Sequence, residues 1–129
     1  MTKIYREMLF SRALDRLTTQ GTFREAYLVS RAGLVWAQTA GADNQEGFAA
    51  LTSVAAAAFE RAAAAGFKPL TLRMELDDGT TVVFYRFQHA GESAEEFFVA
   101  AVAEAPGAEE VALIVWVAEE IKEDLKLFY

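Results

Sequence analysis

Apolar residues recur at helical spacing at the start of the chain. Those on one helical face are Leu9, Phe10, Ala13, Leu14 and Leu17, and most charged residues fall elsewhere. Gly21 follows, which is typical of the position just after a helix. The pattern predicts a helix over residues 2–20.

A second helix is predicted over residues 44–65. Asp43 or Asn44 can cap its first turn, and Gly66 follows its last. Its apolar stripe consists of Phe48, Leu51, Ala55, Phe59 and Ala62.

Two pairs of apolar segments flank turn sequences, which predicts two hairpins. The first joins residues 26–29 to 34–37 through Gly33. The second joins residues 70–76, where apolar and polar residues alternate, to 80–87 through Asp77-Asp78-Gly79. Asp-Gly is a common hairpin turn.

Two interpretations of the last third stay open. We expect a fifth strand over residues 97–102 and a final helix over 109–128. However, residues 93–96 (Ser-Ala-Glu-Glu) also fit a helix-capping box, and residues 111–117 would pass for a buried strand. Periodicity does not settle short apolar runs.

The order of these elements predicts an α/β (α+β) fold with a central five-stranded antiparallel sheet. The strands are apolar on both sides, as residues 82–85 (Val-Val-Phe-Tyr) illustrate, so we expect helices on both faces. The helix over 44–65 would cover one face and the terminal helices the other. No linker or repeat interrupts the chain, so residues 1–129 are predicted to form a single domain.

Composition narrows the function. The net charge is −7 and there is no Lys/Arg cluster with interleaved aromatic residues, so nucleic acid is not an expected partner. Cysteine is absent, which excludes disulfides and thiolate chemistry. No apolar run reaches the roughly 18–20 residues of a membrane span. The charged start over residues 3–7 does not resemble a signal peptide, so we expect the cytoplasm.

No residue combination points to catalysis. His89 is the only histidine, and a lone histidine in a polar loop is an ordinary surface residue. Asp77-Asp78 and Glu109-Glu110 are explained by a turn and by the first turn of a helix. We therefore expect no catalytic residue, metal or cofactor. The charge run from Glu119 to Lys126 is interpreted as a solvated helix face, with an acidic docking surface as the alternative. Trp36 and Trp116 are interpreted as core or interface anchors.

Alanines cover the side of helix 44–65 opposite its apolar stripe. That side comprises Ala49, Ala50, Ser53, Ala56, Ala57, Glu60, Ala63 and Ala64. A solvated face would normally carry more lysine and glutamate, and small side chains allow a second helix to approach closely. The alternative is that alanine is simply the best helix former. We interpret this face as an interface.

The chain resembles the Roadblock/dynein light chain family, particularly its bacterial gliding-motility branch. The resemblance rests on residues 25–37 (EAYLVSRAGLVWA), on the alanine-rich helix from Phe48 to Ala65, and on the strand and Asp-Gly turn that follow. It implies a Roadblock/profilin-like fold and a homodimer or heterodimer whose second helices and third strands pair. Thr71, Arg73 and Glu75 would then join the helix residues at the interface. It also implies docking of a small Ras-like GTPase or a motor-complex subunit.

Two other functions compete with this one. A small-molecule sensor of the PAS or GAF type shares the architecture, but it needs a cavity with convergent polar groups, whereas bulky apolar residues would fill this one. An enzyme is the less expected alternative, because no phosphate-binding loop or Gly-x-Ser-x-Gly motif is present. The sequence leaves open which GTPase binds and whether its hydrolysis is stimulated.

Overall fold

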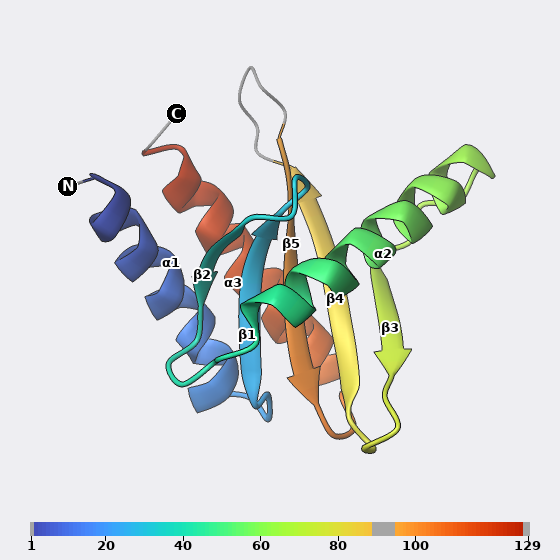
Figure 1. Ribbon diagram of the computed structural model, residues 1–129, viewed down its shortest axis with the longest axis horizontal. Coiled ribbons are helices and arrows are strands. Elements are labelled where there is room, and N and C mark those ends of the chain that lie inside the picture. Colours follow the sequence, from blue (N-terminus) through green and yellow to red (C-terminus); the bar gives the residue numbers. More distant parts are fainter. Residues whose placement is uncertain (1, 89–94, 128–129) are drawn as a thin grey trace.

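Three helices and five strands make up the computed structural model, which describes residues 2–88 and 95–127 (Figure 1). The elements are α1 (Thr2–Thr19), β1 (Glu25–Ser30), β2 (Val35–Gln38), α2 (Gln45–Ala64), β3 (Thr71–Glu75), β4 (Thr81–Gln88), β5 (Glu96–Ala103) and α3 (Ala108–Leu125). Both predicted hairpins and the first two helices are confirmed, with ends that differ by one or two residues.

The strands form one antiparallel sheet in the order β2-β1-β5-β4-β3. β5 lies at the centre, paired with β1 on one side and β4 on the other, although it is the last strand in the sequence. β2 and β3 are the two edges. The predicted five-stranded antiparallel sheet is therefore confirmed.

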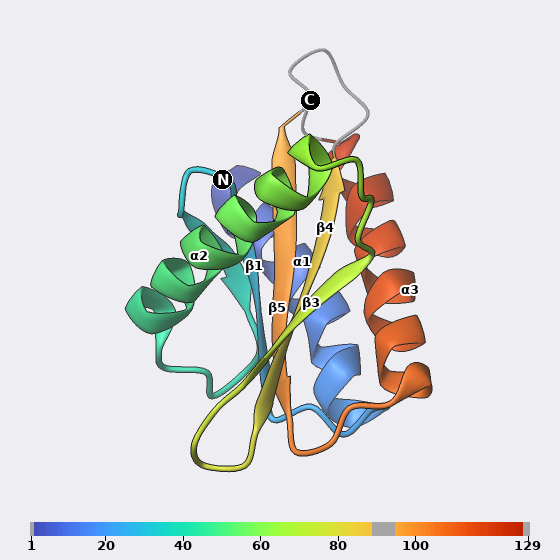
Figure 2. The same cartoon turned by 90° about the vertical axis from the view of Figure 1, so that its right-hand side faces the viewer.

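Helices cover both faces of the sheet, as the sequence predicted. Figure 2 shows α2 on one side and α1 with α3 on the other. The side chains of β4 and β5 alternate between two cores: Val83, Val99 and Ala101 pack under α1 and α3, whereas Phe84 and Phe98 pack under α2. Because each central strand is buried on both sides, its sequence is apolar throughout.

The turn between β3 and β4 shows why Asp-Gly stands there. Gly79 has a φ of 88°, which strains any residue with a side chain. The Asp78 carboxylate accepts hydrogen bonds from the Thr80 backbone N–H at 2.9 Å and from the Thr80 hydroxyl at 2.6 Å. These bonds lower the pKa of Asp78. Asp78 thus has a structural role in the turn.

In the last third of the chain, the structure confirms a fifth strand followed by a final helix. Residues 96–103 pair with both β1 and β4, and Phe97 and Phe98 are fully buried on opposite faces of β5, as expected for a central strand with a core on each side. In α3, the Glu110 side chain accepts from the Gly107 N–H at 2.8 Å, so this acid caps the first turn. Ser93 and Ala94, on which the competing capping box depended, lie outside the described residues.

None of the helices, over the residues that the structure describes, combines the length and the apolar character that crossing a membrane would require.

Candidate interaction surface

Local hydrogen bonds define where α2 begins and ends. The Asn44 side chain accepts from the Gly47 N–H at 3.2 Å, and a Cβ at Gly47 would lie only 2.6 Å from that side chain. At the other end, the Phe67 N–H donates to the Ala62 carbonyl at 2.9 Å and the Gly66 N–H donates to that of Ala63 at 3.0 Å. This Schellman arrangement ends the helix at Ala64, with Ala65 as its C-cap.

The buried stripe of α2 agrees with the prediction. Phe48, Ala55 and Phe59 are buried, and Leu51 and Ala62 are half-buried. Thr52 is also buried on this side, where its hydroxyl donates to the Phe48 carbonyl at 2.6 Å and so keeps its polar atom satisfied.

A buried tyrosine holds the start of α2 against the sheet. The hydroxyl of Tyr27, on β1, accepts from the Asn44 N–H at 2.9 Å and donates to the Glu25 carboxylate at 2.9 Å. Its ring stacks on Phe48 with 4.4 Å between ring centroids. Burial, opposed by the Asn44 hydrogen bond and reinforced by the Glu25 carboxylate, raises the pKa of Tyr27 to about 12. One side chain thus links β1, the loop before α2 and α2 itself.

Removal of this hydroxyl should weaken the fold. In Tyr27→Phe the Asn44 N–H loses this partly buried hydrogen bond, and loss of such a bond costs about 0.5–1.5 kcal/mol. The raised pKa also makes the free energy of unfolding depend on pH. The folded state keeps the Tyr27 phenol neutral more strongly than the unfolded state does, so its contribution to stability is complete below about pH 10 and is lost as the pH rises towards 12. We expect urea unfolding to show both effects.

The variant serves as the control for the alkaline loss. Only the part of the alkaline slope that disappears in Tyr27→Phe belongs to the Tyr27 hydroxyl. Equal slopes in both proteins, together with equal stability at neutral pH, would contradict the assigned role.

The outer side of α2 divides into two flanks. Glu60 forms an ion pair with Arg31 of the β1–β2 turn, and Arg31 also binds Glu96 at 3.1 Å. At 3.6 residues per turn, Ala49, Ala56 and Ala63 lie on this same flank. By the same spacing, Ala50, Val54, Ala57 and Arg61 lie on the opposite flank, turned away from the β1–β2 turn. In Figure 1, β3 lies on the other side of α2 from that turn. Ser53 and Ala64 are exposed on the ridge between them.

The structure places the predicted β3 side chains on the other face of the sheet from α2. Leu72 and Met74 pack against the core under α2, so Thr71, Arg73 and Glu75 point towards the α1–α3 side. Arg73 donates to the Pro106 carbonyl at 2.7 Å, just before α3. β3 therefore turns only its apolar side chains towards α2. Its outer edge pairs with no other strand in the described residues.

Exposed apolar side chains that the sequence pattern did not single out lie on α2 and in its connection to β3. Val54 is 58% exposed on α2, and Phe67 and Leu70 are 67% and 59% exposed in the connection from α2 to β3. We give the name α2–β3 surface to the set formed by Ala50, Val54, Ala57, Phe67, Leu70, Leu72, Met74 and the β3 edge. Phe67 and Leu70 lie close to Pro69 in the connection between two elements, where packing in the core does not explain an apolar side chain. Their position in the sequence could therefore have indicated an exposed apolar surface.

The other candidate residues have local partners. Glu120 binds Arg16 of α1 at 2.6 Å, and Glu123 binds Lys126 at 3.1 Å, while Glu119 and Glu123 are exposed as expected for a solvated helix face. Burial, and then the Glu120 charge, raise the pKa of Asp124. Trp36 packs edge-on against Phe97 at 4.9 Å. His89 lies outside the described residues.

The described residues show little that points to a metal site or a small-molecule site. No three histidine, aspartate or glutamate side chains within residues 2–88 and 95–127 are grouped to hold a metal ion. A surface cavity of about 420 Å³ beside the start of α2 is lined by Gln38, Asp43, Asn44, Gln45 and Glu46. Such a polar lining differs from the mainly apolar one of small-molecule sites.

Comparison with known proteins agrees with the resemblance seen in the sequence. The family model described as "Roadblock/LC7 domain" matches residues 9–84, more than half of the chain. A comparison with curated protein sequences finds no match. The resemblance, the predicted fold and the family type are thereby confirmed.

Solved structures show the same fold at low sequence identity. Myxococcus xanthus MglB superposes with a TM-score of 0.73 at 16% identity, over 95% of this chain and 91% of that one. The gliding protein MglB from Thermus thermophilus gives 0.70 at 18% identity, over 92% and 89%. A structure described as MglB with tetrameric arrangement gives 0.64 at 19% identity, over 93% and 87%.

Proposed function

Since the chain belongs to the Roadblock/LC7 family, we propose that it is a dimeric, non-enzymatic module that binds and regulates a small Ras-like GTPase or holds a motor or signalling complex together. The family comprises small interaction and regulatory domains, and this chain is one of them. The proposal treats residues 1–129 as one domain acting in the cytoplasm. Its first partner is a second copy or a homologous subunit, and neither nucleic acid nor a cofactor is required.

The α2–β3 surface is the observation that carries this proposal. An open strand edge has backbone groups that a second strand can satisfy, and the same edge of another copy can continue the sheet across a two-fold axis. The α2 flank with Ala50 and Ala57 then lies beside its symmetry mate. Alanine permits a close approach and requires little polar desolvation, and exposed Val54 adds apolar area.

The printed descriptions of solved relatives support self-association and a role in motility. One is described as having a tetrameric arrangement and another as a gliding protein. A dimer would present its paired α2 helices as one composite surface on the open side of the sheet. We propose that the GTPase docks there, so that binding requires the dimer.

Two measurements test the proposal on the full chain. Light scattering should give a mass above that of the 14.2 kDa monomer, and titration calorimetry with the organism's Ras-like GTPases, loaded with a GTP analogue, should show binding. A monomeric wild-type protein would contradict the dimer. Binding that survives in a monomeric variant would show that the GTPase does not use the composite surface, and binding to none of the GTPases would contradict the partner.

A further inference from the structure

β2 lies at the opposite end of the sheet from β3, and its outer edge also pairs with no strand in the part of the chain that the structure describes. Just after β2, the Thr39 N–H donates to the Ala26 carbonyl of β1 at 3.0 Å. Backbone groups of successive residues point in opposite directions in an antiparallel pair, so the N–H and C=O of Gln38 point away from β1. Such groups can hydrogen-bond to an added strand.

Two surface hollows flank this edge. The cavity of about 420 Å³ described above lies beside the start of α2. A second cavity, of about 250 Å³, is lined by Glu7 and Ser11 of α1, by residues 35–38 of β2 and by Gln45 of α2. Gln38 and Gln45 line both cavities, and the Gln45 side chain donates to that of Gln38. The two hollows are therefore adjacent along the β2 edge.

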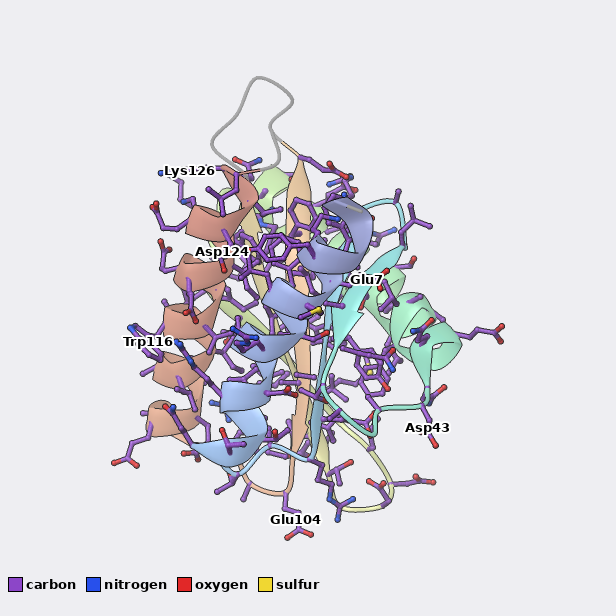
Figure 3. All side chains as sticks on the ribbon, turned by 90° about the vertical axis from the view of Figure 1, so that its left-hand side faces the viewer. Glu7, Asp43, Glu104, Trp116, Asp124 and Lys126 are labelled. Carbon is purple, nitrogen blue, oxygen red and sulfur yellow. The ribbon has the colours of Figure 1, made fainter. Side chains whose placement is uncertain are left out.

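The linings of these hollows are acidic. Glu7, Asp43 and Glu46 line them and are exposed, and neither lining includes a lysine or arginine among the described residues. Arg6 lies over the ring of Trp36 at 4.1 Å but lines neither hollow. Figure 3 looks onto this side of the molecule, where β2 lies between α1, which carries Glu7, and the start of α2, which Asp43 precedes. A basic side chain is thus attracted from both sides of the edge.

We propose that the β2 edge binds an extended segment of a partner protein that is rich in lysine or arginine and adds to the sheet as a further strand. Side chains of an added strand alternate between the two faces of the sheet. Basic residues on one face reach Glu7 beside α1, and those on the other reach Asp43 and Glu46 beside α2. The β2 edge of a second copy would bring the same acids together, so charge favours a different, basic partner.

A β-bulge limits which strands this edge accepts. The register shifts between Leu28 and Val29 of β1, which leaves Trp36 as the extra residue of β2. A bulge and a short edge strand both discourage unselective pairing, so selectivity comes from the side chains that enter the two hollows. The inference does not depend on the α2–β3 dimer. In that dimer β2 is the outermost strand at each end of the continuous sheet, and both β2 edges stay open.

The test uses the full chain, titration calorimetry and the NMR shifts of backbone amides. The probe is the capped peptide Thr-Arg-Lys-Val-Arg-Lys-Thr, which has basic residues on both faces when it is extended. A second peptide of this sequence with methylated backbone nitrogens keeps the charge but cannot donate to the carbonyls of β2. Glu7→Lys and Asp43→Lys each reverse one acid beside the edge. Glu119→Lys is the matched control, because it makes the same charge change at an exposed position on α3.

We expect the probe to bind the wild type and Glu119→Lys equally, and the methylated peptide to bind neither. Glu7→Lys and Asp43→Lys should weaken binding about tenfold, since each replaces an attraction by a repulsion. The amide shifts should centre on residues 35–38.

Four results would overturn the inference: no binding to the wild type, an equal loss in all three variants, equal binding of the methylated peptide, or amide shifts confined to residues away from β2. A fifth is a lower mass by light scattering for Glu7→Lys and Asp43→Lys without peptide, because the edge would then be occupied by a second copy. Since the α2–β3 dimer is tested by other substitutions, the two proposals fail separately.

Discussion

Ala57→Glu is expected to abolish self-association through α2. Ala57 is exposed on the flank of α2 that faces β3, where the proposed two-fold brings it close to its symmetry mate. One substitution then acts twice. Overpacking costs about 1–3 kcal/mol at each site, and an unpaired buried charge adds to that cost. Light scattering should show loss of the dimer contact, and GTPase binding should be lost with it.

Two control variants show whether the effect is specific to the flank of α2 that carries Ala57. Ala63→Glu introduces the same charge at an exposed position on the opposite flank of the same helix, and it should leave the mass unchanged. Lys122→Ala, on the charged part of α3, should also have little effect. If Ala57→Glu changes neither the mass nor the melting temperature, the alanines are merely good helix formers and the interface lies elsewhere. If Ala63→Glu alone dissociates the protein, the contact uses the other flank.

The elements of the fold could be predicted because local rules and tertiary packing agree. Asp77 to Gly79 required a turn, Asn44 and Gly66 bounded α2, and the doubly apolar strands required two covering layers. The assignment of residues 93–118 could not be made, since Phe97 to Val102 is apolar throughout and has no period. Only the pairing of β5 with both β1 and β4 makes it a strand.

The candidate surface was harder to predict for a different reason. A period of two shows that Leu72 and Met74 share one face of β3 and that Thr71, Arg73 and Glu75 share the other, but it does not show which face α2 covers. Likewise, helical spacing groups the alanines of α2, but only the Arg31–Glu60 ion pair shows which flank faces away from β3. The two tryptophans were equivalent in sequence, yet Trp36 packs on the core and Trp116 does not.

Leu28→Ala should cause a much larger loss of stability than Leu34→Ala, six residues along the same hairpin. Leu28 is fully buried on β1, in the core under α1 and α3, whereas Leu34 is 63% exposed in the turn. Truncation of a buried leucine costs about 2–5 kcal/mol because it removes apolar contacts and leaves a cavity. That is a large part of the total stability of a typical domain, about 5–15 kcal/mol. The exposed substitution should change stability by about 0.5 kcal/mol or less.

Urea unfolding of both variants measures the difference, with tryptophan fluorescence as the probe. Trp36 lies in the same core as Leu28, so its emission reports directly on the packing of that layer. Equal losses from the two substitutions would mean that the core under α1 and α3 contributes little to stability, and that the two-core architecture does not hold the fold together as described.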